Sequence, residues 1–231
     1  MSNLKKKKLG IIGGLGPMAT VRFYEMLTNY TNATSDQEHI DIIIFSSSSI
    51  PDRTAFITGK SDESPLPAIL EIVEKLNTLD VDYIVMPCIT GHYFAEQIQN
   101  ASNAVMLNIL DETVLHLRTM EVQSARIIAT DGTITSGILQ KTLENAGIQP
   151  VLPTPSESMK VMDVIYSLKS GKRPEPENLK KQLNFSGQAD VSLLACTELS
   201  LISTLIAKNL PNHIDCMEVL ARKAVSLCSP T

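Results

Sequence analysis

Two of the four cysteines lie in settings that suit acid/base chemistry. Cys88 and Cys196 follow the apolar runs Tyr83–Met86 and Val191–Ala195, and each stands close before a threonine. A thiol at the carboxyl end of a buried parallel strand, next to the start of a helix, lies where the helix dipole favours a thiolate, so we expect a lowered pKa. One such cysteine alone is more often an inert buried thiol. The matched pair favours a catalytic interpretation.

Two thiols on opposite sides of a substrate can invert a carbon stereocentre. One removes the proton from its face, the other donates a proton to the opposite face, and the roles exchange for the other enantiomer. Cys216 and Cys228 lack the strand-end setting, so we interpret them as structural residues in a loop and in a C-terminal helix. The sequence contains no Cys-x-x-Cys pair, and we predict no metal site.

Candidate substrate contacts follow the second apolar run of the chain. Ser46–Ser49, with Ser47 among them, offers hydroxyl and backbone donors to a carboxylate. Arg53 follows a rigid Ile-Pro-Asp segment and suits bidentate carboxylate binding, whereas the alternative is a surface ion pair with Asp52. Lys169 stands at the end of a predicted helix, where a lysine ordinarily satisfies the helix dipole.

A glycine-rich turn and two histidines are the sequence features that point to a bound cofactor or metal, but the support for either is weak. Gly14–Ala19 matches a loose dinucleotide-binding pattern, but Pro17 removes an amide donor and no acidic residue ends the next strand. These glycines more plausibly let backbone amides approach a carboxylate. His39 and His92 have no partner at metal-ligand spacing and are interpreted as structural, although His92 could bias the ionisation of Cys88.

The elements that must position these residues alternate along the chain. Six short apolar runs have the length of buried strands: Leu9–Ile12, Ile40–Phe45, Tyr83–Met86, Val105–Ile109, Ala125–Ala129 and Val191–Ala195. Amphipathic segments between them predict helices: Ala19–Asn32, Pro65–Leu79, Ala95–Ala101, Asp111–Met120, Ser136–Ala146 and Ser156–Ser170. Alternating strands and helices indicate an α/β fold with parallel sheets flanked by helices.

The two halves of the chain also share a similar order of sequence features, as in a weak internal repeat. Each half has a strand that ends in a Gly- or Thr-rich loop and a strand that ends in a cysteine. This pattern predicts two similar lobes, with the active site in the cleft between strand ends. We assign residues 1–113 and 208–231 to the first lobe and residues 114–207 to the second.

Composition excludes several classes of protein. The chain has 231 residues, of which 43% are hydrophobic, so it can bury a sizeable core. Its net charge of −5 argues against a nucleic-acid binder, because such proteins present a basic face to phosphate. No stretch approaches the roughly 18 apolar residues of a membrane span, and Leu9–Ile12 is too short for a signal peptide. We therefore expect a cytoplasmic protein without a membrane partner.

Several segments together resemble the aspartate/glutamate racemase family, and within it the aspartate racemase branch. They stand in the family's order and cover nearly the whole chain: Gly10–Thr20, Asp36–His39, Ile50–Thr54, Met86–His92, Ala129–Thr133 with Ser136-Gly137, and Cys196–Leu199. The resemblance implies a two-lobed fold with pseudo-two-fold symmetry. It also implies racemisation without pyridoxal phosphate or any other cofactor, and a homodimer.

The resemblance also implies roles for single residues. Cys88 and Cys196 match the family's catalytic pair, and Arg53 and Lys169 match the basic residues that hold the substrate's side-chain carboxylate.

Further substrate contacts follow from the same resemblance. Thr90 and Thr197 match the positions that bind the α-carboxylate or amino group, and Glu198 matches the acidic residue after the second Cys-Thr. Ser47 and Thr130, in loops after strands, complete the predicted substrate-binding set.

Three departures from the family pattern cluster at the predicted pocket. Ile89 stands where the family usually has Asn, Ser46–Ser49 replaces an Asn-Pro segment, and Ala195 replaces Gly. Loss of one hydrogen bond to a charged group costs about 1.5–3 kcal/mol, so these changes favour an altered or relaxed substrate preference. Because both thiols remain, the proton-transfer chemistry is expected to persist.

Three functions are therefore open. The first is a racemase of an acidic amino acid, with aspartate foremost. The second is a related isomerase or decarboxylase of a dicarboxylic acid that uses one cysteine. The third is a non-catalytic homologue that binds an amino acid.

Overall fold

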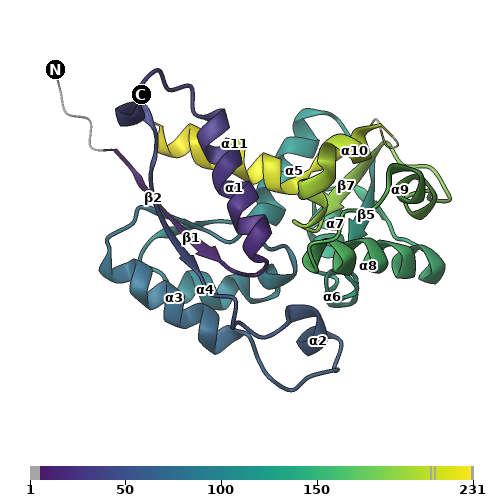
Figure 1. Cartoon of the computed structure of the whole chain (residues 1–231), viewed down its shortest axis with the longest axis horizontal. Helices are drawn as coiled ribbons and strands as arrows, with labels where there is room; N and C mark the ends of the chain where they lie inside the picture. Colours follow the sequence, from purple (N-terminus) through teal and green to yellow (C-terminus); the bar gives the residue numbers. More distant parts are fainter. Residues whose placement is uncertain (1–5, 209, 211, 230–231) are drawn as a thin grey trace.

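Two four-stranded parallel sheets form the framework of the computed structural model, which describes residues 6–208, 210 and 212–229 (Figure 1). The first sheet, of order β2-β1-β3-β4, comprises β1 (Lys8–Gly13), β2 (Asp41–Ser46), β3 (Tyr83–Val85) and β4 (Val105–Leu107). The second, of order β6-β5-β7-β8, comprises β5 (Ser124–Ala129), β6 (Gln149–Val151), β7 (Val191–Ala195) and β8 (His213–Asp215). The two orders are equivalent, and the prediction of two similar α/β lobes is confirmed.

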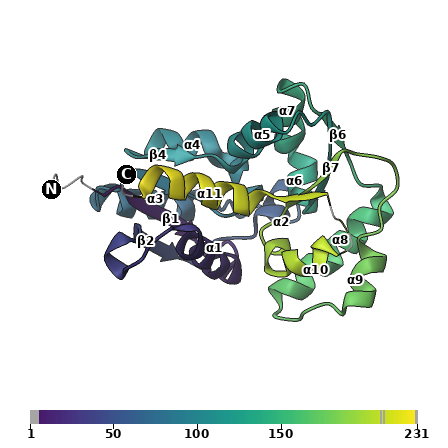
Figure 2. The same ribbon diagram turned by 90° about the horizontal axis from the view of Figure 1, so that it is seen from above.

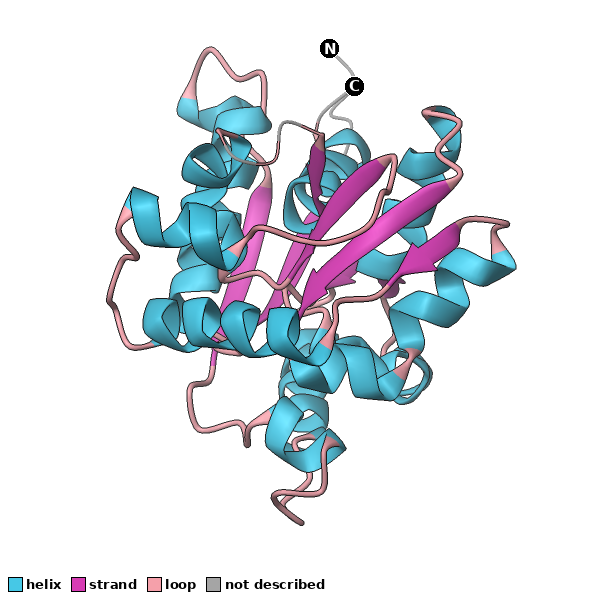
Figure 3. Cartoon of the chain, turned by 90° about the vertical axis from the view of Figure 1, so that its right-hand side faces the viewer, coloured by secondary structure: helices cyan, strands magenta, loops and turns pink. Residues whose placement is uncertain are grey.

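Helices flank both faces of the sheets (Figure 3). Those of the first half are α1 (Pro17–Tyr30), α2 (Arg53–Ile57), α3 (Leu66–Thr78), α4 (Ala95–Ala101) and α5 (Ile109–Thr119). Those of the second half are α6 (Asp131–Ser136), α7 (Ile138–Asn145), α8 (Pro155–Lys169), α9 (Pro176–Gln182), α10 (Ser203–Ala207) and α11 (Cys216–Cys228). Short 3₁₀ turns cover Asp36–Glu38, Thr90–Phe94 and Leu199–Ile202. No helix within the described part of the chain is both long and apolar enough to cross a membrane.

The central strands are aliphatic and almost wholly buried, which explains why their sequences form strands. Every residue of β7 is buried, as is every residue of β1 and β5 after the first. Each large apolar side chain that leaves water contributes about 1.5–3 kcal/mol, and β-branched residues suit a buried parallel sheet. The burial of these strands therefore fixes the edge from which the site loops emerge.

Strand register brings the functional loops together at the carboxyl edges of the sheets. In the second sheet, Ala129 pairs with Ala195, so the next residues, Thr130 and Cys196, leave the sheet side by side. In the first sheet, Ile11 of β1 pairs with Val85 of β3, and Cys88 follows three residues later. Both thiols thus lie at strand ends, as predicted.

Helix α11 joins the two lobes. It begins directly after β8 of the second sheet and packs against α1 and α5 (Figure 2). One hydrophobic cluster includes buried residues of both sheets, among them Leu9 of β1 and Ile127 of β5. The lobes therefore share a continuous core.

The predicted lobe boundaries need two corrections. Residues 113 and 114 lie inside α5, so a helix crosses the first boundary. We placed residues 208–231 in the first lobe, but His213–Asp215 pairs with β7 in the second sheet. A strand of three residues is too short to show a hydrophobic pattern in the sequence. For α11, the assignment to the first lobe agrees with its contact with the first-lobe helix α1. Of the assigned ranges, residues 1–5, 209, 211, 230 and 231 lie outside the described part.

Candidate active site

A small cleft between the two lobes brings most of the predicted site residues together. Its volume is about 10 Å³, room for about one water molecule. It is lined by Leu15, Asp52, Arg53, Thr54, Cys88, Ile89, Thr90, Thr130, Lys169, Cys196, Thr197 and Glu198. Binding of an amino acid therefore requires the lobes to separate or the lining side chains to move.

Each lobe contributes one thiol to this cleft. Cys88 lies in the loop after β3, where its backbone N–H donates to the Met86 carbonyl at 2.7 Å, and Cys196 follows β7 directly. The two residues are 6% and 5% exposed. Thiols from opposite lobes that border one closed cleft are placed to act on a single ligand from two sides.

Cys196 differs from our prediction in the direction of its pKa shift. Its thiol donates a hydrogen bond to Glu198 Oε2 at 3.0 Å. Burial, followed by the charge of Glu198 and this hydrogen bond, raises the pKa of Cys196 well above its ordinary value, while the charge of Lys169 opposes the rise. The prediction of a lowered pKa was wrong for Cys196 because burial of the thiol and the nearby Glu198 carboxylate both disfavour the thiolate.

Glu198 is a buried carboxylate whose two oxygens have different surroundings. Oε2 accepts the hydrogen bond from Cys196, whereas Oε1 is buried without a hydrogen-bond partner. Oε1 lies only 2.7 Å from the position that a Cβ on Gly16 would occupy, at the N-terminus of α1. A glycine at position 16 thus leaves the space that this oxygen needs, and Oε1 remains free to accept a hydrogen bond.

Lys169 pairs with Asp52 across the cleft. The distance between Lys169 Nζ and Asp52 Oδ2 is 3.6 Å. Burial works to lower the pKa of Lys169, but the charges of Glu198, Cys196 and Asp52 outweigh it and raise the pKa. The lysine is therefore a cation that faces three acidic groups.

Arg53 is buried, in contrast to the surface ion pair that was its alternative interpretation. Its guanidinium donates to the carbonyl oxygens of Leu15 at 2.7 Å, Pro51 at 2.9 Å and Ile50 at 3.3 Å. These bonds tie the loop after β1 to the segment before α2. Arg53 thus borders the cleft while most of its donors hold backbone.

Three threonine hydroxyls form a triangle across the two lobes. Thr90 Oγ1 of the first lobe lies 2.9 Å from Thr130 Oγ1 and 3.0 Å from Thr133 Oγ1 of the second, and the last two are 3.2 Å apart. All three residues are at least 93% buried. Thr90 and Thr130 therefore contact each other as well as the cleft, and a ligand that bonds to either must compete with this triangle.

The remaining predicted contacts have separate outcomes. Thr197 lines the cleft and is buried. Ser47 does not line it, since its hydroxyl lies 3.1 Å from the Ser49 hydroxyl and its N–H donates to the Gly13 carbonyl. The structure thus places eight of the nine predicted site residues at the cleft, and Ser47 lies outside its lining.

Asp52 was missed as a member of the site. It was considered only as a partner of Arg53, but it caps α2, accepting from the Ala55 N–H at 2.8 Å, and reaches Lys169 from the other lobe. An aspartate just before a helix is a recognisable N-cap signal. The contact with Lys169, 117 residues away, depends on the docking of the lobes.

His92 has a structural role close to Cys88. Its Nδ1 lies 2.9 Å from the Cys88 carbonyl oxygen, and the Ile109 N–H donates to Nε2 at 3.3 Å. Because a carbonyl only accepts and a backbone N–H only donates, the proton is on Nδ1 and the ring is neutral. This histidine joins the Cys88 loop to the start of α5.

Acidification is expected to destabilise the protein through His92. Burial lowers the pKa of His92 from 6.5 to about 4, against an opposing contribution from the Cys88 carbonyl. Between these values the unfolded chain binds more protons, so the free energy of unfolding is highest above about pH 6.5 and falls by about 3 kcal/mol toward pH 4. Urea unfolding of the wild type and of His92→Gln at successive pH values measures this term. Equal pH dependence in both proteins contradicts it.

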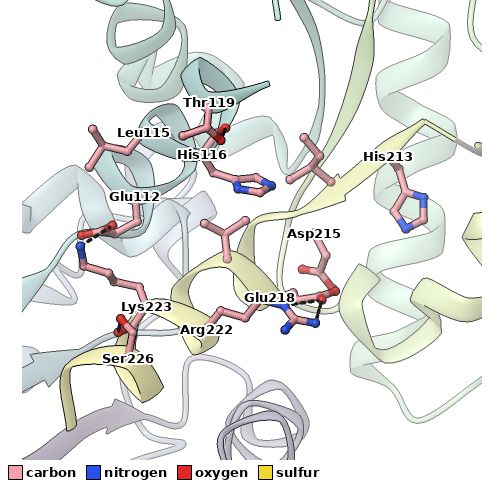
Figure 4. Close-up of a pocket in the computed structure, with 12 residues that line it drawn as sticks. Glu112, Leu115, His116, Thr119, His213, Asp215, Glu218, Arg222, Lys223 and Ser226 are labelled. Carbon is pink, nitrogen blue, oxygen red and sulfur yellow. Dashed lines mark hydrogen bonds and ion pairs between the residues drawn. The ribbon is translucent and has the colours of Figure 1, made fainter. Parts of the chain in front are cut away.

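A larger cavity lies elsewhere, between α5, β8 and α11 (Figure 4). Its volume is about 560 Å³. Its charged side chains pair with each other: Lys223 with Glu112 at 3.4 Å and Arg222 with Glu218 at 2.8 Å. Its described lining includes none of the nine predicted site residues and no thiol. This cavity is larger than the cleft, but the acid/base groups converge on the smaller cleft, which is the better candidate active site.

The described residues contain no cluster of three or more histidine, cysteine or acidic side chains that could hold a metal ion.

The turn before α1 has Gly16 as its N-cap and Pro17 as its first helical residue. Pro17 has no N–H to offer a phosphate, and the carboxylate of Glu198 lies beside this turn. The turn is therefore poorly suited to the pyrophosphate of a dinucleotide.

Known proteins resemble this chain over almost its whole length. A family model for Asp/Glu/hydantoin racemases matches residues 12–224. The chain is 29% identical over 227 residues to the broad specificity amino-acid racemase RacX of Bacillus subtilis (strain 168), covering 94% of this chain and 96% of that protein. It is 31% identical to the solved Picrophilus torridus aspartate racemase, with a TM-score of 0.85 and coverage of 96% and 94%.

A more distant structure shares the fold alone. Glutamate racemase from Francisella tularensis subsp. tularensis SCHU S4, solved with D-glutamate, is 17% identical, with a TM-score of 0.71 and coverage of 96% of this chain and 81% of that one.

Proposed function

This chain belongs to the Asp/Glu/hydantoin racemase family, and on that premise we propose that it racemises an acidic amino acid, aspartate foremost, without a cofactor. The observation that carries the proposal is the cleft that Cys88 and Cys196 border from opposite lobes. The aspartate racemase and the broad specificity racemase that resemble the chain support an isomerase of amino acids. They differ in the substrate range that their names state, so the cleft itself has to indicate the substrate.

The proposed reaction moves one proton across the α-carbon. A thiolate removes the α-proton, and the electron pair of the C–H bond remains on the α-carbon, delocalised into the carboxyl group. The thiol on the opposite face then donates its own proton to that carbon and becomes a thiolate. At the end of one turnover the first residue is the thiol and the second is the thiolate, so the α-carbon has lost one proton and gained one. No external oxidant, reductant or acyl group is consumed.

The raised pKa of Cys196 assigns starting roles to the two thiols. Cys196 is protonated in the free enzyme, since burial and the neighbouring Glu198 carboxylate disfavour its thiolate. It acts as the acid when Cys88 is the base. In the reverse direction Cys196 must lose its proton, and the nearest described acceptor is Glu198 Oε2 at 3.0 Å. Glu198 thus serves both to hold the thiol and to receive its proton.

The substrate's polar groups have matching partners around the cleft. Lys169 supplies a cation for the side-chain carboxylate, and the hydroxyls of Thr90, Thr130 and Thr197 border the place of the α-carboxylate or amino group. A well-oriented pair of acid/base groups around a held substrate accounts for a large part of an enzyme's rate. Closure of the lobes excludes water from the carbanion.

Incubation of the purified protein with L-aspartate in deuterated water tests the function. We expect D-aspartate to accumulate until the enantiomers are equal, because their free energies are identical, and deuterium to replace the α-proton. Chiral chromatography and proton NMR measure the two outcomes. Exchange of both L- and D-aspartate that needs Cys196 but not Cys88 would favour the single-cysteine enzyme. Binding of aspartate without any exchange, for either aspartate or glutamate, would favour a non-catalytic binder and contradict the proposal.

A further inference from the structure

The turn that carries Glu198 is attached to α11, the helix that joins the two lobes, by a buried hydrogen bond between side chains. Ser200 Oγ donates to Asp215 Oδ1 at 2.7 Å, and the two residues are 1% and 4% exposed. Ser200 lies in the 3₁₀ turn Leu199–Ile202, which follows Glu198 directly, whereas Asp215 stands where β8 ends and α11 begins (Figure 4). The proposed reaction uses neither residue directly, so any effect on it has to pass through a neighbour.

We propose that Ser200 and Asp215 are positioning residues, which hold the Glu198 carboxylate against the Cys196 thiol. This inference rests on the proposed racemase function and deepens it, because it identifies what fixes the proton acceptor of Cys196. The described lining of the cleft includes neither Ser200 nor Asp215, so both act through Glu198.

The backbone hydrogen bonds of the turn are local. The Leu199 N–H donates to the Cys196 carbonyl at 3.0 Å, and the Leu201 N–H donates to the Glu198 carbonyl at 3.1 Å. Bonds of this 3₁₀ type have poorer geometry than those of an α-helix, and such turns are short. They shape the turn but attach it to no other element. The packing of its apolar side chains and the hydroxyl of Ser200 therefore have to place it.

Asp215 gives this attachment a fixed end. Its Oδ1 also accepts from the Met217 N–H at 2.9 Å, and this bond caps α11. Helix α11 in turn packs against α1 and α5. The hydrogen bond from Ser200 thus attaches the turn of Glu198 to a helix that contacts the first lobe, on which Cys88 lies.

Loss of the Ser200 hydroxyl would leave Asp215 poorly satisfied. Among the described residues, Oδ2 of Asp215 is already buried without a hydrogen-bond partner. Burial raises the pKa of Asp215 and the charge of Glu218 adds to the rise, while the hydrogen bonds from Ser200 and from the backbone oppose it. A buried polar group that loses a partner is costly. Removal of the hydroxyl should therefore displace the carboxylate or the turn.

Movement of the turn would change two properties of Cys196 in opposite senses. Glu198 Oε2 lies 3.0 Å from the thiol, and after burial it is the main cause of the raised pKa of Cys196, which the charge of Lys169 opposes. With Glu198 displaced, the thiol ionises more easily and reacts faster with an alkylating agent. It is then no longer held protonated as the acid, and it loses the acceptor of its proton, so turnover falls.

Ser200→Ala tests the proposal through both properties. We expect kcat for aspartate to fall by about tenfold or more with little change in KM, and the apparent pKa of Cys196 in alkylation to fall. Iodoacetamide labelling at successive pH values, resolved by peptide mass spectrometry, measures Cys196 relative to Cys88 in the same protein. Wider opening of the lobes would raise the labelling of both thiols alike.

Three further variants separate the hydrogen bond from the stability of the fold. Asp215→Asn keeps an acceptor for Ser200 and the cap of α11, and it should retain most of the wild-type kcat. Asp215→Ser still caps the helix, but its side chain is too short to reach Ser200, so it should reproduce both effects of Ser200→Ala. Ser226→Ala removes an exposed hydroxyl from the same helix and should change neither property.

The outcomes distinguish this proposal from the racemase function. Wild-type kcat and wild-type labelling of Cys196 in Ser200→Ala overturn the positioning role and leave the function intact, as does an equal rise in the labelling of both thiols. A loss of kcat in Asp215→Asn as large as in Ser200→Ala also overturns it. If the wild-type protein exchanges the α-proton of no amino acid, the function fails, and the labelling of Cys196 then decides the positioning role alone.

Discussion

Replacement of either Cys88 or Cys196 by serine is expected to abolish detectable racemisation of aspartate. A serine hydroxyl fills nearly the same space, but it does not ionise near neutral pH and is a far weaker general base than a thiolate. Loss of one acid/base group lowers kcat by about 10²–10⁴-fold. Chiral analysis of product, starting from each enantiomer separately, measures this decrease.

The two variants should retain different partial reactions. Each thiol faces one side of the α-carbon, so the remaining thiol can still remove the proton of the enantiomer that points toward it and return deuterium to the same face. We expect Cys196→Ser and Cys88→Ser each to wash out the α-proton of one enantiomer without inversion, and of opposite enantiomers. Proton NMR in deuterated water distinguishes the two patterns. Exchange of the same enantiomer by both variants contradicts a mechanism with two opposed bases.

Two other cysteines provide matched controls. Cys216 and Cys228 are buried in α11 and do not line the cleft. Burial raises the pKa of Cys216 to about 12 and that of Cys228 to about 11. Cys216→Ala and Cys228→Ala should keep the wild-type kcat/KM, although either can lower stability. Loss of activity in either variant, with the fold intact, would contradict the assignment of the active site to the cleft.

The six predicted strands are correct because their sequences carry a strong physical signal. Strands buried on both faces need continuous runs of aliphatic residues, and β1, β5 and β7 have them. The strands β6 and β8 escaped prediction because neither is an aliphatic run: β6 contains Gln149 and Pro150, and β8 contains His213 and Asp215. Pro150 within β6 also argues against a strand, because proline has no N–H to donate to a neighbouring strand. An edge strand can accommodate it.

Short helices and a helix break were also missed. The predicted helix Ser136–Ala146 is divided at Gly137, which has a positive φ of 67° and separates α6 from α7. The segment after Gly171 contains α9 from Pro176 onward, which was not among the predicted helices. Helices α2, α6 and α10 have five or six residues, which leave too few periodic positions for the sequence pattern to distinguish them from loops.

The candidate site was predictable in its residue types but not in its electrostatics. The matched settings of Cys88 and Cys196 identified the thiols before any contact was known. The pKa of Cys196 depends on how a 3₁₀ turn folds Glu198 back onto the thiol, and the partner of Lys169 depends on lobe docking. Local sequence patterns show which residue types stand at the end of a strand, because that concerns single elements. They do not show which charged groups meet in the folded protein, because such contacts depend on tertiary structure.

The close approach of the two lobes at Gly132 leads to a second large expected effect. Helix α6 packs against α2 of the other lobe. A Cβ on Gly132 would lie 2.8 Å from Thr54 Cα and 3.0 Å from Thr90 Cγ2. The first of these atoms is backbone and has no rotamer with which to move away. Gly132→Ala is therefore expected to push the lobes apart next to the threonine triangle.

Displacement of one lobe should lower the rate of racemisation more strongly than it lowers the stability of the fold. The two thiols act on one carbon, so their geometry depends on lobe closure, and a misplacement of about 1 Å can lower a rate by about 10²-fold. Overpacking of this kind lowers stability by about 1–3 kcal/mol. We expect kcat/KM of Gly132→Ala to fall by about 10²-fold while the protein remains folded, as measured by steady-state racemisation and urea unfolding.

Thr135→Ala, on the exposed side of the same helix, is the matched control and should retain wild-type kinetics. Small-angle scattering adds a direct readout, since a more open lobe arrangement raises the radius of gyration. If Gly132→Ala has normal kcat/KM and an unchanged radius, the contact between α6 and α2 does not set the catalytic geometry. If instead its radius rises and the rate falls, while Thr135→Ala matches the wild type, then closure of the lobes, and not the thiols alone, brings the two acid/base groups to opposite faces of one substrate.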